Sequence, residues 1–407
     1  MDTGVLTSRA AGIARSVSGL TEFMTDSAWA RRRPERGIAD FTFANPHDLP
    51  LPGVLDAIRA SAGPHATDWY AYKMSEPAAQ AAAAASLGDW YDMEFDPADI
   101  ALTTGAFGAL AVALNTVCEP GDEVIFSLPP WFFYEPLVRQ VGATPVKAPI
   151  DPLTFDLDLV AIESAITPRT RAIIVNTPNN PTGRIYPPQT LRLLASLLAS
   201  ASARNGRPIY VISDEPYNRL VFDGKRPHTP AAYYPHTLIA YSYGKVLLAP
   251  GQRLGYLALA PSMPEREQMR QAILLNQMTM GWAFPNAVMQ YALPELERQS
   301  IDIAALQRKR DRMVGALREM GYLVRVPEAT FYLLPRSPRE NDIEFADILA
   351  GEDVFVLPGS YFDMPGYFRI SLTATEEMIE RSLPGFAAAL EWARAYDLVD
   401  AVAADGY

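Results

Sequence analysis

The chain has 407 residues, 49% of them hydrophobic, which is enough for about two globular domains with sizeable cores. Its net charge of −12 argues against nucleic acid or an anionic membrane surface as its main partner. The single cysteine, Cys118, rules out an intrachain disulfide and favours a reducing compartment, so we expect a cytoplasmic protein.

Metal proteins and membrane proteins are also disfavoured. The four histidines are scattered, without the spacing of a zinc or iron site, so we expect no metal. No run of about 18 apolar residues occurs, so we expect no membrane span. The first 20 residues are compatible with a transit peptide, but we favour a helix that folds onto the body of the protein.

The first hundred residues predict mainly helices. Residues 1–37 read as one or two helices, and the prolines in residues 41–52 favour an irregular segment. Residues 51–62 and the alanine-rich residues 77–87 are predicted as helices, the second with Pro77 in its first turn.

From residue 100, strands alternate with helices along the sequence. The predicted strands are 100–103, 123–126, 171–176, 208–212, 238–241 and 254–260, and the predicted helices among them are 106–117, 136–141 and 188–203. This alternation indicates an α/β fold with a mostly parallel sheet covered by helices on both faces. Sheets of this kind bind ligands at the carboxyl ends of their strands.

After residue 262 the pattern changes to that of a smaller α+β unit. We expect helices at 265–280 and 285–309, the second continuing to about residue 319, and a last helix at 376–395. Strands are predicted at 322–326 and 331–335, and the segments 343–349, 354–356 and 368–372 complete the unit. Strands and helices no longer alternate regularly here, which separates this region from the sheet before it.

A single lysine, Lys245, lies between two apolar runs that both read as short buried strands. A lysine amine removed from water loses its proton more readily and can then attack a carbonyl group to form a Schiff base. Ser242 before it and Arg253 after it supply a hydroxyl and a guanidinium that can bind an anion. Taken alone, Lys245 also fits an ordinary solvated loop, because lysine is seldom buried.

Polar side chains follow several other predicted strands. The turn at residues 176–183 closes one strand, and Asp214 follows the next one. The link at residues 103–108 joins a strand to a helix, whose first N–H groups form an anion site. Trp131, just past another strand, can provide a flat platform for a planar ring. Taken singly, these features also fit loops, a helix cap and a core aromatic.

Together these segments resemble the class I/II aminotransferases, a family of fold-type-I pyridoxal-phosphate enzymes. The resemblance runs from about Phe41 to Leu372. Its most specific stretches are Asn-Asn-Pro-Thr-Gly at 179–183, Ser-Asp-Glu-Pro-Tyr at 213–217, and Ser242-x-x-Lys245 followed by Gly251-x-Arg253-x-Gly255. All three occur in this order at strand ends, and their agreement argues against chance.

The resemblance implies a division of the chain into two domains. Residues 48–285 would form a large cofactor-binding domain, with a mostly parallel seven-stranded sheet between helices. Residues 286–407 would form the small α+β domain, together with an N-terminal arm at residues 1–47. The family usually forms homodimers with the active site shared between subunits.

The resemblance also implies roles around a bound pyridoxal 5′-phosphate. Lys245 would hold the cofactor as a Schiff base and then move the substrate's Cα proton. Asp214 would face the ring nitrogen and keep it protonated, so that the ring accepts the Cα electron pair. Asn180 and Tyr217 would form hydrogen bonds with the phenolic oxygen of the ring, and Trp131 would stack on the ring.

The remaining implied contacts concern the phosphate and the substrate. The phosphate would bind backbone N–H groups at Gly105, Ala106 and Phe107, the side chains of Ser242 and Arg253, and Tyr70 lent by the partner subunit. Arg369 would clamp the substrate α-carboxylate with its planar fork, beside Asn180 and Ala44. Gly244 departs from the family pattern, because a second serine often stands there.

We therefore interpret the protein as an aminotransferase that moves an amino group between an L-amino acid and a 2-oxo acid by a ping-pong mechanism. Phe107, Phe132, Phe133 and Trp282 favour an apolar or aromatic substrate over aspartate. A pyridoxal-phosphate lyase, decarboxylase, cyclase or oxidase remains an alternative, because all of these use the same electron sink. A non-catalytic binding module is a third interpretation, although the presence of both a lysine and a carboxylate favours chemistry.

Overall fold

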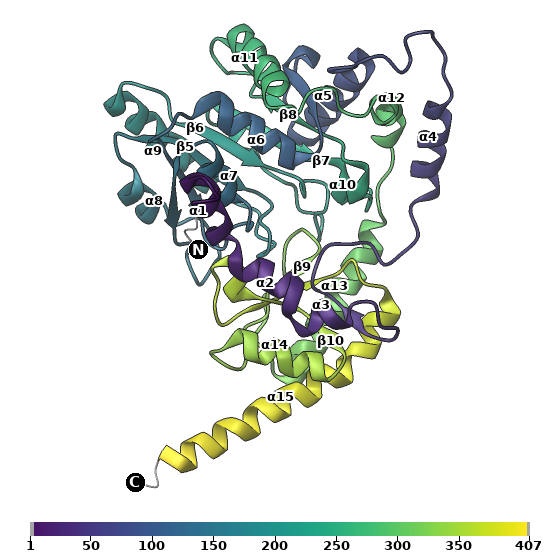
Figure 1. Ribbon diagram of the computed structural model, residues 1–407, viewed down its shortest axis with the longest axis vertical. Coiled ribbons are helices and arrows are strands. Elements are labelled where there is room, and N and C mark those ends of the chain that lie inside the picture. Colours follow the sequence, from purple (N-terminus) through teal and green to yellow (C-terminus); the bar gives the residue numbers. More distant parts are fainter. Residues whose placement is uncertain (1–3, 405–407) are drawn as a thin grey trace.

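The computed structural model describes residues 4–404, with side chains up to residue 395, and a seven-stranded sheet lies in its upper half in Figure 1. The strands follow the order β2-β8-β7-β6-β5-β3-β4. Their bounds are β2 (Ile100–Thr103), β3 (Glu123–Ser127), β4 (Thr144–Ala148), β5 (Thr170–Asn176), β6 (Tyr210–Asp214), β7 (Thr237–Ser242) and β8 (Gly255–Leu259).

The sheet is mostly parallel, as the alternating pattern predicts. β8 runs antiparallel to both of its neighbours, β2 and β7, while every other neighbouring pair is parallel. The sequence did not predict β4, because this edge strand is largely exposed and carries Lys147 in place of an apolar run. The predicted strand at 208–212 also lies two residues later, so that Asp214 is the last residue of β6 and does not lie beyond it.

Successive strand residues point to opposite faces of the sheet and build two cores. Ile174 and Ile212 join the larger core, with α5 (Pro77–Tyr91) and α6 (Ala106–Val117). Ile173 and Val211 join the second core, with α8 (Leu159–Ala165) and α9 (Pro188–Asn205). Helices therefore cover both faces, and polar groups of the sheet concentrate where the strands end.

Further helices pack around the larger core. α11 (Arg266–Thr279) lies against α6, and α12 (Ala287–Leu296) lies against α5 and against α4 (Pro52–Ala62). α7 (Tyr134–Gln140) follows β3 and contributes Tyr134 and Val138 to this core. The segment after β3 is thereby held close to the sheet.

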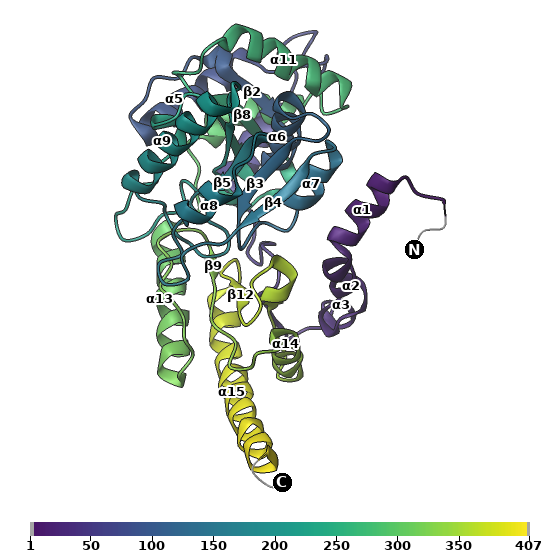
Figure 2. The same cartoon turned by 90° about the vertical axis from the view of Figure 1, so that its left-hand side faces the viewer.

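The C-terminal region carries two small sheets. β9 (Tyr332–Leu333), β11 (Leu357–Pro358) and β12 (Phe368–Ser371) form one, and β10 (Val354–Phe355) pairs with β1 (Ala39–Asp40) in the other. The helices here are α13 (Ile303–Met320), α14 (Asp342–Gly351) and α15 (Glu376–Ala404), and the end of α15 extends away from the body (Figures 1 and 2).

Two predictions in this region are wrong. Residues 285–319 do not form one helix, because α12 ends at Leu296 and α13 begins only after Asp302, whose side chain accepts a hydrogen bond from Ala305 N at 2.9 Å. Within the break, Ile301 N donates to Val246 O at 2.9 Å. Residues 322–326 do not form a strand, and one of their carbonyls, at Val324, accepts from the Arg318 side chain instead.

The N-terminal arm forms three helices where one or two were predicted: α1 (Ser8–Ser16), α2 (Ser18–Asp26) and α3 (Ala28–Arg32). α1 lies beside α7 (Figures 1 and 2). Phe23 and Trp29 pack with Phe355 and Phe362 of the C-terminal region. The arm thus touches both parts of the chain, and the predicted division at residues 47/48 and 285/286 stays a prediction. Within residues 4–404, no helix is long and apolar enough to cross a membrane.

Candidate active site

A cavity of about 160 Å³ opens at the carboxyl edge of the large sheet. It is lined by Ala106, Phe107, Leu110, Trp131, Asn180, Asp214, Pro216, Tyr217, Ser242, Lys245 and Arg253. Nine of these eleven residues were predicted from the sequence, and only Leu110 and Pro216 were not. They come from segments 106–253 of the chain that the sheet brings to one edge, as expected for strand ends in an α/β fold.

The strand register explains why these side chains meet. Asn176 and Asp214 are direct neighbours at the ends of β5 and β6. Gly255, at the start of β8, pairs with both Thr103 and Ser242. A Cβ at position 255 would lie 2.1 Å from Tyr241 O and 2.7 Å from Gly105 Cα. Only glycine therefore allows β8 to approach these two backbone segments so closely.

An anion cradle lies at one end of the cavity. Gly105 has a φ of 84° and precedes α6, whose first N–H groups point at this space. A Cβ at Gly105 would lie 3.1 Å from Arg253 Nη2 and 3.4 Å from Ser242 Oγ. Arg253 is held in the left-handed region, with a φ of 48°, and donates to Thr104 O at 3.0 Å. Backbone amides, a hydroxyl and a guanidinium thus converge as a phosphate group requires.

Gly244, the departure from the family pattern, has a structural reason. A Cβ at this position would lie 2.9 Å from Pro250 Cα, so a serine there would displace the loop that carries Arg253. The hydroxyl of Ser242 remains close to the cradle.

Lys245 lies on the short helix α10 (Tyr243–Val246), directly after β7. It is partly buried, and its Nζ lies 5.8 Å from the ring centre of Tyr217 and 5.9 Å from that of Phe331. These aromatic neighbours restrict the access of water to the amine. The position suits an amine that must reach a ligand inside the cavity.

Asp214 is buried, and its two carboxylate oxygens differ. Oδ2 accepts a hydrogen bond from Tyr134 OH at 2.6 Å, whereas Oδ1 has no hydrogen-bond partner. Burial raises the pKa of Asp214 to about 6, although the Tyr134 hydroxyl and the charge of Lys245 act in the opposite direction. An unpaired buried acceptor is costly unless a donor fills the adjoining space. A protonated ring nitrogen in the cavity fits this requirement.

Arg369 approaches the cavity through Asn180. Its Nη1 donates to Asn180 Oδ1 at 3.3 Å and its Nη2 donates to Thr42 O at 3.0 Å, while its Nε has no partner. The guanidinium carbon lies 4.4 Å from the ring centre of Tyr332. Arg369 is only 4% exposed, so it does not form a salt bridge on the surface, and its fork is available for a carboxylate.

Tyr217 connects the two sides of this site. Its hydroxyl donates to Tyr332 OH at 3.4 Å, and burial raises its pKa well above the usual value. The hydroxyl therefore stays protonated at neutral pH, and its one proton can turn from Tyr332 to a ligand oxygen.

The aromatic rings of Phe107 and Trp131 form one wall, and Phe133, which does not line the cavity, packs against both. Trp131 lies 4.9 Å from Phe107 and 5.3 Å from Phe133, measured between ring centres, and Phe107 lies 5.2 Å from Phe133. This wall can contact a planar ring or an apolar side chain.

Four predicted residues are not among those that line the cavity: Gly105 and Arg369, whose contacts with its lining residues are described above, and Tyr70 and Ala44. Tyr70 is 62% exposed and its hydroxyl donates to Ala62 O, so within one subunit it does not reach the cradle. Ala44 is partly buried against the main core, two residues beyond the carbonyl of Thr42 that holds Arg369.

Sequence reasoning missed two residues that hold the site together. Tyr134 bonds Asp214, and the Asn176 side chain donates to Asp214 O at 2.8 Å while accepting from Asn180 N at 2.7 Å. Asn176 was seen only as the start of a turn, and Tyr134 was not singled out. The spacing of residues along the sequence predicts neither of these contacts.

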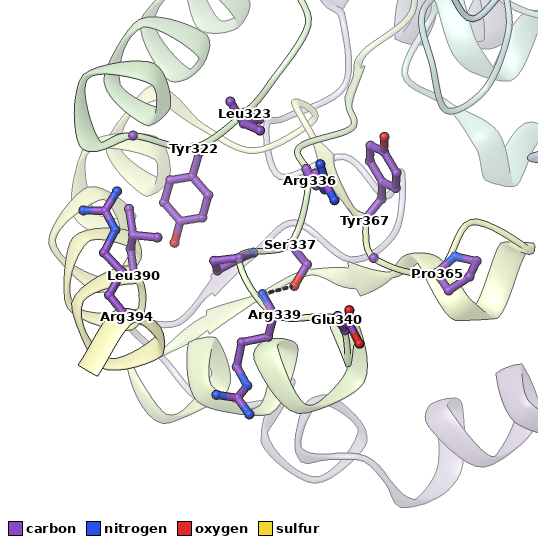
Figure 3. A pocket seen from close by; sticks show the side chains of 13 residues that line it. Tyr322, Leu323, Arg336, Ser337, Arg339, Glu340, Pro365, Tyr367, Leu390 and Arg394 are labelled. Atoms are coloured by element: carbon purple, nitrogen blue, oxygen red, sulfur yellow. Dashed lines mark hydrogen bonds between the residues drawn. The ribbon is translucent and has the colours of Figure 1, made fainter. Parts of the chain in front are cut away.

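A larger cavity, of about 720 Å³, lies in the C-terminal region and does not include Lys245 (Figure 3). Its arginines do not converge. Arg339 reaches toward Glu344 at 3.5 Å, and Arg394 lies over Gly321, where an added Cβ would be 2.5 Å from its Nη2. Among the residues whose side chains are described, no group of three His, Cys, Asp or Glu is arranged to hold a metal.

The family profile described as aminotransferase class I and II matches residues 37–384. The chain belongs to this family. This aminotransferase is 32% identical over 313 residues to the probable aspartate/prephenate aminotransferase of Thermus aquaticus, an alignment covering 74% of this chain and 78% of that protein. It is 29% identical over 307 residues to aromatic-amino-acid aminotransferase 2 of Thermococcus litoralis, covering 72% and 76%.

Solved structures agree with this assignment. The crystal structure of an aminotransferase from Eubacterium rectale has a TM-score of 0.83 to this chain at 27% identity, covering 95% of this chain and 96% of that one. The predicted fold type I and the predicted aminotransferase function are confirmed. Aminotransferases of this family depend on pyridoxal phosphate and act on amino acids and 2-oxo acids.

Proposed function

We propose that this aminotransferase binds pyridoxal 5′-phosphate in the cavity at Lys245 and exchanges an amino group between an L-amino acid and a 2-oxo acid by a ping-pong mechanism. The observation that carries the proposal is the pairing of a partly buried lysine with a buried carboxylate that has one unpaired oxygen, in a single cavity. The phosphate-sized cradle of Gly105, Ser242 and Arg253 supports the same ligand.

When bound, the cofactor supplies an electron sink for the bonds to the substrate's Cα. Lys245 would hold the cofactor, and its amine, when free, would move the proton at the substrate's Cα. Asp214 would hold a proton at the ring nitrogen, and Asn180 and Tyr217 would donate hydrogen bonds to the ring's oxygen. Phe331 and Tyr217 keep water from the amine.

Arg369 and Asn180 would position the substrate by its α-carboxylate. With Arg369→Lys, we expect KM for both the amino acid and the 2-oxo acid to rise about 10- to 100-fold, because an ammonium cannot make the two parallel bonds of a guanidinium. Initial rates at varied substrate concentration measure this change. The matched control Arg336→Lys, at an exposed arginine of the distant cavity, should leave KM unchanged. Equal effects in both variants would contradict the role.

We propose an apolar or aromatic side chain for the amino donor. The wall of Phe107 and Trp131, against which Phe133 packs, carries no charge that would pair with an acidic substrate. Trp282 lies beside the first turn of α6, since a Cβ at Gly108 would be 3.6 Å from its Cε3. The names of the two relatives include both an acidic and an aromatic amino acid, so the relatives alone do not decide between them.

A panel of L-amino acids with 2-oxoglutarate as acceptor tests this function. We expect phenylalanine, tyrosine or leucine to give a higher kcat/KM than aspartate. A clear preference for aspartate would refute the substrate class but leave the aminotransferase intact. Formation of an amine, ammonia or peroxide, without a new amino acid, would instead favour a lyase, decarboxylase or oxidase on the same scaffold.

The active form would be a homodimer with a shared site. Tyr72, Trp282, Phe284, Leu275 and Met278 are exposed apolar side chains, and the rings of Tyr72 and Phe284 lie 4.8 Å apart. Apolar groups gathered on a surface usually mark an interface. A second subunit could then bring Tyr70 to the cradle. Sedimentation that finds only monomers of the active enzyme would contradict this assembly.

The single cysteine, buried Cys118, suits a reducing compartment such as the cytoplasm.

A further inference from the structure

We propose that Tyr134 is a positioning residue that presents Asp214 to the cofactor ring, by holding one carboxylate oxygen so that the other is left for the ring nitrogen. This inference rests on the proposed function, because it needs a ring in the cavity. Tyr134 itself does not line the cavity, so its action passes through Asp214.

The hydrogen bond is short and sheltered. Tyr134 OH donates to Asp214 Oδ2 at 2.6 Å, and both side chains are buried. The tyrosine ring lies between Phe126 and Trp131, whose ring centres are 5.9 Å and 5.7 Å away. Because the ring is packed on these sides, the hydroxyl has little freedom to turn away from the carboxylate.

The two oxygens of Asp214 are thereby made unequal. Oδ2 receives Tyr134 and lies 3.5 Å from Asn176 Nδ2, while Oδ1 receives no hydrogen bond. Asn176 donates its shorter hydrogen bond, at 2.8 Å, to the backbone oxygen of Asp214. This bond fixes the main chain and not the carboxylate. Tyr134 is therefore the group that sets the rotation of the carboxylate.

The same bond favours the ionised form of Asp214. The titratable groups around it are Tyr134 from α7, Lys245 from α10, and Glu215 and Tyr217 in the segment after β6. Burial favours the protonated acid, and the Tyr134 hydroxyl is the largest influence in the opposite direction. Burial also raises the pKa of Tyr134 well above the usual value, so this neutral donor keeps its proton at neutral pH.

The neighbouring acid, Glu215, differs in its surroundings. It accepts hydrogen bonds from Ser213 and Thr229, each at 2.6 Å, and a further one from Tyr91, and burial raises its pKa to about 7. Its donors fill both of its oxygens, so it offers no free acceptor to a ligand. On Asp214, by contrast, the donors reach only Oδ2, and Oδ1 is left for the ring.

Tyr134→Phe tests the inference, because it removes one oxygen and keeps the packed ring. The matched control is Tyr241→Phe, which removes the hydroxyl of another buried tyrosine that has no hydrogen-bond partner. In the full chain without cofactor, the carboxyl band of Asp214 is followed by infrared spectroscopy as the pH is varied. The midpoint of this titration should lie about one pH unit higher in Tyr134→Phe than in the wild type. Asp214→Asn identifies the band, and the control should not shift it.

A second measurement uses the holoenzyme with cofactor labelled at the ring nitrogen. Nitrogen NMR should show a protonated ring in the wild type and a smaller protonated fraction in Tyr134→Phe, and the cofactor dissociation constant should rise about tenfold. An unchanged carboxyl titration, or a nitrogen signal equal to that of Tyr241→Phe, would overturn the inference. Failure of the wild type to bind cofactor would instead refute the proposed function, while the carboxyl titration would still decide the role of Tyr134.

Discussion

Lys245→Ala is expected to abolish transamination, with kcat lowered about 10⁴-fold. Lys245 is the lysine that lines the cavity, and its amine lies within 6 Å of two aromatic rings that shelter it. Without it, no group lining the cavity can both bond an aldehyde and carry a proton to and from Cα. Single-turnover assays with an amino acid measure the loss directly.

The control for this variant is Lys225→Ala. Lys225 lies on the surface and pairs with Glu328, so its removal should change the rate less than about twofold. Borohydride reduction of the wild-type holoenzyme, followed by peptide mapping, should leave a pyridoxyl group on Lys245 and not on Lys225. A label on another lysine, or full activity of Lys245→Ala, would refute the assignment of the site.

Asp214→Asn is expected to lower kcat about 10³-fold while keeping the shape of the side chain. An amide carries no charge, so the ring nitrogen would lose the partner that keeps it protonated. Cofactor affinity should also fall, which absorbance titration measures. The control Asp223→Asn changes an acid on the surface, bonded to Arg310 at 2.7 Å, and should leave both quantities nearly unchanged. Normal turnover in Asp214→Asn would show that the ring works without this carboxylate.

The same substitution should stabilise the cofactor-free protein. Burial raises the pKa of Asp214 to about 6, against about 3.9 in an unfolded chain. The folded state therefore binds the proton more tightly, and stability falls as pH rises from about 4 to about 6. Two pKa units correspond to about 3 kcal/mol, so Asp214→Asn should gain up to that amount at about pH 7.5 and little at about pH 4. Urea unfolding at the two pH values measures the difference.

This opposition of activity and stability follows from the unpaired oxygen of Asp214. In the absence of a ligand it is an unsatisfied buried charge, and with a protonated ring beside it the charge is paired. A destabilising effect of Asp214→Asn in the cofactor-free protein at neutral pH would show that some other group already compensates the charge.

Much of the site was predictable from the sequence because strand ends carry a local signature. Apolar runs such as 171–176 and 238–241 mark buried strands, and the polar residues just after them, Asn180 and Lys245, fall at one edge of a parallel sheet. The family motifs then assigned roles to residues whose positions were already set by this pattern. Edge strand β4 was missed because a half-exposed strand lacks the apolar run.

The sequence by itself determined the type of fold and the residues that open into the cavity, because period and composition act over a few neighbouring residues. Only the tertiary structure decided which side chains pair across long separations. Arg369 meets Asn180 across 189 residues, and Tyr134 meets Asp214 across 80. Such contacts depend on strand order and on packing between elements, and these arise from the whole chain and leave no local pattern.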